Sequence, residues 1–374
     1  MKTKIAVVYH YFPHYREPIM RELVGSDRYS FAFYGSHAVH EGIKVFTGDA
    51  QIPVHPLRFK MLGRIWMLRG YWEPLIDPRI SGLVVHGHPY MPAAWMIILV
   101  TKVLRKKLIF WTHGWLRPES HLKRFVKNIF YSNADAVMTY GERAITVAQS
   151  DGYTQRNIFP IGNSLDWPRA QLALRKIRED PLKHTFKSLF GSPDRPLIIC
   201  SARLTAACRF DLLIEAARIC AASEFPLNVL LIGDGPERST LEQMAAECSV
   251  DVHFYGACYD EEVIAAATYE AELTVSPGKV GLTAIQSLTY GTPVITHGDF
   301  NAQMPEVEAI QAGRTGEFFA RDSAQDLARV VRHWLSTRLD RDAVRIDCMN
   351  AVASRWNPMS QREAIEAVLD QVFS

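Results

Sequence analysis

Three histidines lie at the ends of candidate β-strands. His86 and His88 are two residues apart, so both side chains point to one face where the backbone is extended, and His113 ends another candidate strand. Three converging imidazoles are able to bind zinc. The alternatives are buried polar residues with local partners, or hydrogen-bonding groups for a substrate. Because no carboxylate or cysteine pattern accompanies the histidines, the sequence favours the absence of a metal site.

A glycine-containing loop and an arginine form a second group. Pro277-Gly-Lys-Val-Gly281 precedes a helical segment, and a helix that begins there directs free N–H groups at an anion. Arg203 follows a candidate strand and has the bidentate geometry that suits phosphate. These residues predict a phosphate site, with a plain turn and a surface ion pair as alternatives. Gly233-Asp-Gly235 is weaker, because Arg238 replaces the third glycine of a dinucleotide-binding motif.

The hydrophobic pattern predicts the scaffold for these loops. Short β-branched or aromatic runs alternate with longer amphipathic stretches, which is typical of parallel sheets with helices around them. The pattern occurs twice, in residues 1–166 and 196–356. Between them, the charged and proline-containing segment 167–195 is expected to form a linker with one irregular helix. We therefore expect an α/β protein of two doubly wound, Rossmann-like domains that face each other across a cleft. Ligands should bind at the carboxyl ends of the strands.

Charge is distributed unevenly along the 374 residues. Residues 1–166 hold 21 Lys and Arg against 12 Asp and Glu, a net of +9, and the remainder holds 21 against 28, a net of −7. Basic and large apolar residues interleave in 57–72, which predicts an amphipathic helix, either in the core or on an anionic membrane. Lys102, Arg105, Lys106 and Lys107 add to the basic charge. Without a nucleic-acid-binding motif, we expect no nucleic-acid partner.

Other features indicate the compartment. The six cysteines fit no zinc or redox spacing, and the longest apolar run, Met91–Val100, has ten residues, about half of a membrane-spanning helix. The apolar stretch at the start is short and is broken by His10, unlike a signal peptide. We expect a cytoplasmic protein with reduced thiols, peripheral on the inner face of the cell membrane if its basic half binds lipid.

Several blocks of the second half occur in a recognisable order. They are Ser201-Ala-Arg-Leu204 with 211–217, then 230–237, Phe254-Tyr-Gly256, Val275-Ser-Pro-Gly278, 281–295 and 315–319. Ile161-Gly-Asn-Ser-Leu-Asp166 closes the first half. Together these blocks resemble family 4 of the glycosyltransferases over about residues 1–335, more specifically in the second half. The resemblance implies the GT-B fold, a nucleotide-sugar donor (UDP- or GDP-linked) in the C-terminal domain, an acceptor in the N-terminal domain, retention of anomeric configuration and no metal. It also implies a last helix, about 357–374, that joins the first domain.

The resemblance assigns roles to single residues. His113 would lie near the transferred sugar and Arg203 would hold the donor diphosphate, so these two are the expected catalytic residues. The expected donor-binding residues are Arg209, Gly256, Tyr259, Gly278, Val280, Gly281, Leu282, Thr283 and Gln286. The expected acceptor-binding residues are Tyr11, His14, Arg16 and His88.

The chain departs from the family pattern at three positions. Cys208 replaces the lysine that partners the arginine, although Arg209 follows it, and Gly278 and Gln286 replace the two glutamates of the family's E-x7-E motif. We expect a retaining glycosyltransferase that acts on a glycan or polyprenyl-linked glycan acceptor in capsule, exopolysaccharide or O-antigen synthesis. The alternatives are a non-catalytic sugar- or nucleotide-binding relative with a decayed donor site, and another GT-B enzyme such as a sugar-nucleotide epimerase.

Overall fold

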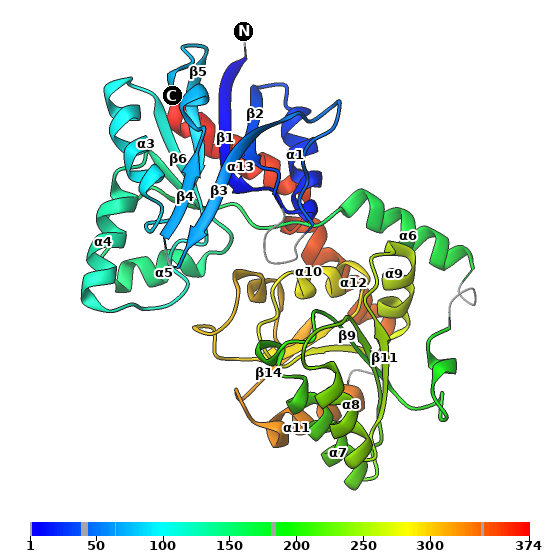
Figure 1. The fold of residues 1–374 in the computed structure, drawn as a ribbon. Coiled ribbons are helices and arrows are strands. Elements are labelled where there is room, and N and C mark those ends of the chain that lie inside the picture. The colour runs from blue at the N-terminus through cyan, green and yellow to red at the C-terminus, as the bar shows by residue number, and fades with distance from the viewer. Residues whose placement is uncertain (1, 39–43, 64, 181–184, 338–339) are drawn as a thin grey trace. The chain divides into compact units, whose positions relative to one another are not determined.

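The computed structural model describes residues 2–38, 44–63, 65–180, 185–337 and 340–374. The chain divides into two compact units, coloured by residue number in Figure 1: Met1–Leu165 with Asn357–Ser374, and Asp166–Trp356. Each unit contains one largely parallel sheet with helices around it, which confirms the predicted α/β fold with two Rossmann-like sheets. Among the described residues, no helix is long and apolar enough to cross a bilayer.

The first unit is built on an eight-stranded sheet. Its strand order is β4-β3-β2-β1-β5-β6-β7-β8, and all neighbours pair in parallel except β3 and β4. The strands are β1 (Thr3–Tyr11), β2 (Tyr29–Ser36), β3 (Val54–Leu62), β4 (Ile65–Arg69), β5 (Ile80–His86), β6 (Lys107–Trp111), β7 (Ala136–Thr139) and β8 (Ile158–Pro160). The helices are η1 (His14–Arg16), α1 (Glu17–Val24), α2 (Trp72–Ile76), α3 (Pro92–Val103), α4 (His121–Ser132), α5 (Arg143–Ser150) and α13 (Pro358–Phe373).

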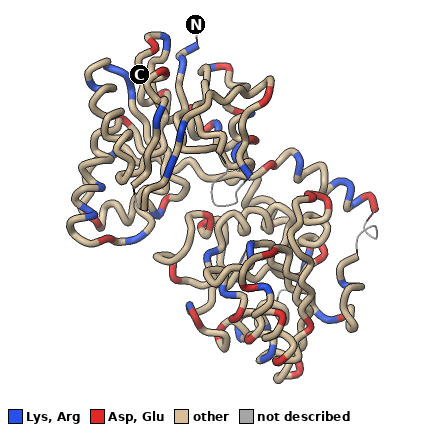
Figure 2. The backbone as a smooth tube through the Cα atoms, in the orientation of Figure 1, with Lys and Arg blue, Asp and Glu red and all other residues tan. Residues whose placement is uncertain are grey.

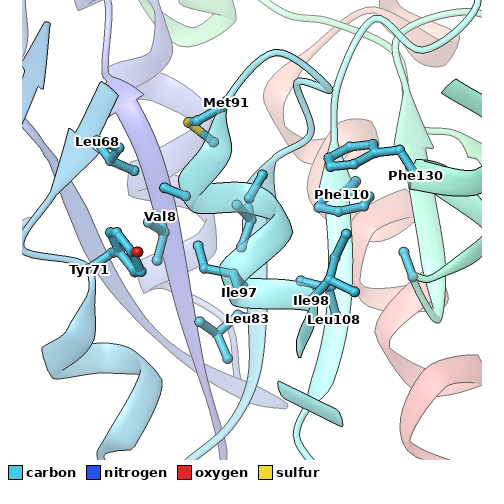
Figure 3. Packing of buried hydrophobic residues seen from close by; sticks show 14 of the residues in the cluster. Val8, Leu68, Tyr71, Leu83, Met91, Ile97, Ile98, Leu108, Phe110 and Phe130 are labelled. Atoms are coloured by element: carbon cyan, nitrogen blue, oxygen red, sulfur yellow. The ribbon is translucent and has the colours of Figure 1, made fainter. Parts of the chain in front are cut away.

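Helix α3 covers the centre of this sheet. In Figure 3, Ile97 and Ile98 of α3 lie in one cluster with Val8 of β1, Leu83 of β5 and Leu108 of β6. All five are 3% exposed or less. Because complete burial of such a side chain stabilises a fold by about 1.5–3 kcal/mol, these contacts hold β1, β5 and β6 together. The loops that follow these three strands therefore start from a rigid base.

The predicted amphipathic helix over 57–72 is wrong. Strands β3 and β4 form an antiparallel hairpin there, with Leu62 opposite Ile65. Leu57 and Phe59 are buried while Lys60 is exposed, so the apolar positions repeat with the period of a strand. The hairpin gains its burial from the neighbouring sheet, which a reading of the isolated segment does not include.

The C-terminal helix α13 belongs to the first unit. Gln361 of α13 is fully buried, and its side-chain amide donates to the carbonyl of Gly162 at 2.9 Å. Its amide oxygen accepts a hydrogen bond from the Ser164 hydroxyl at 2.7 Å. One side chain therefore satisfies two polar groups that come almost 200 residues earlier in the chain.

The second unit has a six-stranded sheet in the order β11-β10-β9-β12-β13-β14, entirely parallel. Its strands are β9 (Leu197–Ser201), β10 (Asn228–Ile232), β11 (Asp251–Gly256), β12 (Leu273–Ser276), β13 (Val294–His297) and β14 (Gly316–Phe319). Its helices are α6 (Trp167–Glu179), η2 (Lys187–Leu189), η3 (Ala206–Cys208), α7 (Phe210–Ala222), α8 (Arg238–Glu247), α9 (Glu261–Glu270), α10 (Leu282–Thr289), η4 (Pro305–Ala309), α11 (Ala324–Thr337) and α12 (Arg341–Arg355).

Helix α6 occupies the first part of 167–195, the segment in which a linker and one irregular helix are expected. Its buried Ala173 and Leu174 pack in one cluster with Ala265 of α9 and with Tyr290. The segment therefore has an apolar partner surface in the second unit, and it groups with that unit. Residues 181–184 of the expected linker lie outside the described residues.

We predict that Gln361→Ala destabilises the first unit by about 2–4 kcal/mol, because it leaves the Gly162 carbonyl and the Ser164 hydroxyl buried without partners. Denaturant unfolding combined with hydrogen exchange of the α13 amides measures the change. Gln371→Ala, at an exposed position of the same helix, is the control and should change neither. Equal effects of the two substitutions would show that the hydrogen bonds of Gln361 do not stabilise the first unit.

Candidate functional site

The sheet of the first unit reverses its winding between β1 and β5. Strands β2 and β3 extend from β1 on one side, whereas β6, β7 and β8 follow β5 on the other. Loops that leave neighbouring strands in opposite directions open a crevice at the carboxyl ends of the strands, where α/β proteins bind ligands. A cavity of about 430 Å³ lies at this place, and Tyr11, Arg16, His88 and His113 are among its lining residues. The structure thus brings four sequence-predicted residues together.

Arg16 lies at the cavity in a cage of aromatic rings. Its guanidinium carbon is 4.6 Å from the ring centre of Trp111, 5.1 Å from that of Tyr140 and 5.2 Å from that of Tyr9. It donates a hydrogen bond to the Tyr140 hydroxyl, and only 8% of the residue is exposed. Burial by itself would lower the pKa of Arg16, but the phenols of Tyr140 and Tyr9 outweigh it and the net shift is upward. Arg16 therefore carries a buried positive charge.

Trp66 and two histidines form a stack on the cavity wall. The Trp66 ring lies 4.2 Å from the His88 ring and 5.4 Å from the His86 ring, measured between centres, at interplanar angles of 9° and 12°. Neither ring nitrogen of His86 has a hydrogen-bond partner among the residues that the structure describes, and His86 is 6% exposed. Burial, followed by the nearby His10, holds the pKa of His86 well below its ordinary value. Burial also lowers the pKa of His88 to about 4, with a contribution from Lys127.

His113 also lines the cavity, two residues after the end of β6. Its ring centre is 4.8 Å from that of Tyr140. Burial, the Arg16 charge and His88 together lower the pKa of His113 to about 4. At neutral pH the cavity therefore presents neutral imidazoles, each with one N–H donor and one nitrogen acceptor. This pattern is suited to the hydroxyl groups of a sugar.

One expected acceptor-binding residue needs qualification. His14 does not line the cavity: it is exposed, and its ring nitrogen lies 3.3 Å from the carbonyl of Lys44. The reason is the tight η1 turn, in which Pro13 and Arg16, three residues apart, share a face that His14 does not. Across the described ranges, no three His, Cys, Asp or Glu side chains are grouped as metal ligands.

Sequence reasoning missed other lining residues, among them Tyr9, Trp66 and Lys127. Tyr9 packs in one cluster with Val7, whereas Tyr11 packs with Val8 on the other face, because the register of β1 shifts between Val8 and Tyr11. Simple alternation along β1 therefore gave no signal for Tyr9. Trp66 could not be found, because the segment was interpreted as a helix. Only the hairpin brings its ring over His86 and His88.

The sheet of the second unit reverses between β9 and β12, and the loops after these strands are in contact. The Gly278 N–H donates to the Cys208 carbonyl at 3.1 Å, and the Thr283 hydroxyl donates to the Ser201 carbonyl at 3.3 Å. A Cβ atom on Gly278 would lie 2.1 Å from the Ala207 carbonyl oxygen, so only glycine permits this approach. Arg203 is exposed on the same pair of loops.

The first turn of α10 provides backbone donors beside this contact. The N–H groups of Leu282 and Thr283 have no acceptor within the helix, as at every helix start. Gly281 precedes them with a φ of 47°. The Val280 N–H is already bound to the Gln303 amide oxygen at 2.9 Å, so it holds the loop in shape. Gln286 lies one turn further along α10 and is partly buried.

The remaining donor-site candidates have other surroundings. Arg209 is paired with Asp211 at 3.0 Å and with Asp322, so a phosphate would compete with two carboxylates for it. Gly256 ends β11, and its carbonyl accepts a hydrogen bond from the Gly233 N–H at 2.8 Å. Tyr259 follows and is 83% exposed. Since β11 is parallel to β9, this loop lies on the same edge of the sheet as Arg203.

Residues 183–346, which include β9 to β14, match the family described as Glycosyl transferases group 1. The chain carries a glycosyltransferase group 1 domain. A GDP-mannose-dependent alpha-(1-6)-phosphatidylinositol dimannoside mannosyltransferase of Mycobacterium tuberculosis is 28% identical over 187 residues, 49% of this chain and 46% of that protein. The 2-deoxystreptamine glucosyltransferase of Streptomyces kanamyceticus is 26% identical over 173 residues, 44% and 43% of the two chains. The chain thus spans about half the length of these relatives.

Solved structures match the fold over almost the whole chain. Anabaena HepE in complex with UDP has a TM-score of 0.69 at 15% identity, with 99% of this chain and 100% of that chain covered. This likeness shows that the group 1 domain is part of a GT-B fold. Membership of family 4 stays a prediction.

The buried histidines predict how stability depends on pH. The pKa values of His88 and His113 are about 4 in the folded chain against an ordinary 6.5, so the unfolded chain binds more protons between these values. The free energy of unfolding should be highest above about pH 6.5 and fall towards pH 4. The loss should reach about 3 kcal/mol per histidine. Denaturant titrations at several pH values measure it.

His113→Gln should flatten this pH dependence, because glutamine does not titrate. His14→Gln removes an exposed histidine of the same unit and is the matched control. A pH slope that His113→Gln leaves unchanged would show that the His113 imidazole is not the neutral, buried group described above.

Proposed function

We propose that this protein is a retaining glycosyltransferase. It moves a sugar from a UDP- or GDP-linked donor to a glycan or lipid-linked glycan acceptor in the synthesis of a cell-surface polysaccharide, such as capsule, exopolysaccharide or O-antigen. The observation that carries the proposal is the pair of loops at the β9/β12 switch point of the group 1 domain, where exposed Arg203 lies on the edge at which α10 begins.

Relatives support the donor class. The name of the mycobacterial relative specifies GDP-mannose, and HepE has been solved with UDP and with UDP-glucose. The diphosphate is common to these donors. An arginine and a helix start are two groups that bind phosphate oxygens. We propose that they replace a metal in neutralising the diphosphate.

The proposed transfer needs no protein nucleophile. The acceptor hydroxyl forms a bond to the anomeric carbon on the same face from which the diphosphate leaves, and its proton passes to the leaving diphosphate oxygen. Arg203 and the N–H groups of Leu282 and Thr283 stabilise the charge that develops on that oxygen. In the first unit, the neutral His113 hydrogen-bonds a hydroxyl of a sugar that occupies the cavity.

One observation favours a second candidate, a sugar- or nucleotide-binding relative without catalysis. Arg209, the residue able to compensate for Cys208, is paired with Asp211 and Asp322. Gly278 has no side chain to contact a donor sugar, and its N–H is bound to the Cys208 carbonyl. Arg203 would then hold the diphosphate without Arg209 as a second cationic side chain. Nucleotide binding without turnover of any donor and acceptor pair would support this candidate.

We predict that Arg203→Ala weakens donor binding and lowers transfer by at least about tenfold, because a charged contact to phosphate is removed. Thermal shifts with UDP, GDP, ADP and CMP identify the base, and a transfer assay follows with the corresponding donor sugars. Arg218→Ala is the matched control, since Arg218 is exposed on α7 and pairs only with Glu215 among the described carboxylates. Wild-type binding and transfer by Arg203→Ala would remove Arg203 from the site.

We also propose that the first unit binds the anionic cytosolic surface of the membrane through α3 and α4. Leu122, Phe125, Val126 and Ile129 form a stripe on α4 at helical spacing, and they are 36–74% exposed. On α3, Met96, Leu99 and Val103 are 42–80% exposed. The two helices are neighbours, because the rings of Trp95 and Phe130 lie 5.0 Å apart between centres.

Charge complements this apolar surface. Residues 78–134 contain nine Lys and Arg but one acidic residue, Glu119, and Figure 2 marks the basic positions of α4 in blue. Glu119 is bound to Lys127 at 2.7 Å. Exposed apolar side chains beside lysine and arginine are the features of segments that lie on anionic lipid. Val126 belongs to the stripe and also lines the cavity, so an acceptor with a lipid anchor would reach the cavity from this surface. Arg64 lies outside the described residues; it belongs to the segment 57–72, for which the sequence indicates either a core helix or a helix on an anionic membrane.

Flotation with liposomes tests this surface. The wild-type protein should float with phosphatidylglycerol-containing liposomes at low salt and less with phosphatidylcholine alone. The double substitution Leu122→Asp and Phe125→Asp should weaken binding at least about tenfold, since each loses an apolar side chain that lipid would cover. Leu172→Asp, at a 52% exposed position of α6, is the control and should float like the wild type. Unchanged flotation of the α4 variant would assign lipid binding to another surface.

A further inference from the structure

Arg16 is a buried cation without a carboxylate partner among the described residues. Its hydrogen bonds go to two neutral phenols, Tyr140 and, at 3.5 Å, Tyr9. Its Nη1 atom is buried and has no hydrogen-bond partner within the described part of the chain. A guanidinium stays protonated in proteins, so the charge cannot be removed by deprotonation. A charge in this position is costly to bury unless a group of opposite sign completes the site.

The aromatic rings around Arg16 compensate for part of this cost. The faces of Trp111, Tyr140 and Tyr9 attract the guanidinium electrostatically. They offer no acceptor for Nη1, however. Arg16 also lines the cavity of about 430 Å³, so a ligand within the cavity is able to supply that acceptor.

The other charged side chains of the cavity wall also leave an excess of positive charge. Besides Arg16, the wall contains Lys123 and Lys127, and Glu119 is its one lining carboxylate. Glu119 is already bound to Lys127, which leaves Lys123 and Arg16 without a charge partner on the wall. The imidazoles of His86, His88 and His113 are neutral at neutral pH and do not change this sum. The cavity is therefore electropositive.

We propose that Arg16 binds an anionic group, a phosphate or a carboxylate, of the ligand that occupies this cavity. In the context of the proposed function, on which this part rests, that ligand is the acceptor. Its anionic group lies at Arg16 and its hydroxyl groups lie against the neutral imidazoles. A phosphate would come from a lipid-phosphate linkage, whereas a carboxylate would come from an acidic sugar. Arg16 thereby selects charged acceptors over neutral ones.

Histidine ring resonances of the full-length protein test the proposal without donor or turnover. The starting protein carries Arg203→Ala, so that the exposed arginine of the second unit does not add to anion binding. His88→Gln and His113→Gln assign the two resonances of the cavity wall. Glycerol 1-phosphate supplies the phosphate, glucuronate the carboxylate, and glycerol and glucose are the neutral counterparts.

At least one anion should shift the His88 or His113 resonance with an affinity at least about tenfold above that of its neutral counterpart. The tighter of the two anions identifies the phosphate or the carboxylate source. Equal shifts with anionic and neutral compounds, or no shift with any of them, would overturn the proposal. This comparison needs no substitution of Arg16, so it is decisive even where an Arg16 variant fails to fold.

Substitutions then locate the anion. Arg16→Gln should abolish the preference for the anion, and Arg16→Lys should keep part of it, because lysine retains the charge and loses the bidentate geometry. Arg21→Gln, at an exposed arginine of α1, is the matched control. If Lys123→Gln removes the preference and Arg16→Gln does not, the anion lies at the rim and the assignment to Arg16 is wrong.

The outcome for anion binding is distinct from the outcome for the proposed function. Anion binding without any sugar transfer would retain this inference and remove the proposed enzyme activity. Transfer to neutral acceptors without anion binding would retain the proposed enzyme activity and overturn this inference.

Discussion

Parallel pairing of β1 with β5 and of β9 with β12 is the constraint on which both candidate sites depend. Parallel strands end at one edge of a sheet, so loops far apart in the sequence meet there. Tyr11, His88 and His113 are brought to one cavity in this way, and Arg203 and Gly278 to one pair of loops. The pairing is itself stabilised by apolar side chains on both faces of the central strands. The positions of the site residues at the carboxyl ends of the strands therefore depend on the apolar packing of the central strands.

The two candidate sites differ in the surroundings of their arginines: Arg16 is buried and Arg203 is exposed. In the first unit, burial keeps the imidazoles of His88 and His113 neutral but cannot neutralise Arg16, so the cavity holds a buried permanent positive charge beside uncharged imidazoles. In the second unit, Arg203 is exposed and its charge is screened by solvent until a ligand covers it. A buried charge selects its ligand by the cost of leaving it unpaired. An exposed charge attracts a ligand from solution.

Helix α4 carries apolar residues on both its buried and its exposed face, so its apolar pattern does not identify the face that packs on the sheet. Phe130 and Tyr131 are buried in the core of the first unit, while Leu122, Phe125 and Ile129 are exposed on the same helix. A helix that packs on one side and exposes apolar side chains on the other has two functions for its hydrophobic residues. The inner set stabilises the sheet and the outer set is available to a lipid surface.

The sequence by itself determined the α/β class, the positions of most central strands and the loops that carry Arg203, Gly278, His88 and His113. The strands follow from the local periodicity of apolar residues, which is visible in the sequence alone. The loops follow because ligands bind at the carboxyl ends of parallel strands. Only the tertiary structure decided that 57–72 is a hairpin, that His14 turns away from the cavity and that Arg209 is paired with Asp211 and Asp322. It also decided that Trp66 stacks on His86 and His88 and that Arg16 is enclosed by three rings. Each of these depends on a neighbour at least two residues away and often much further. Burial, charge compensation and pKa shifts are properties of the surroundings of a side chain, and the surroundings exist only once the chain has folded.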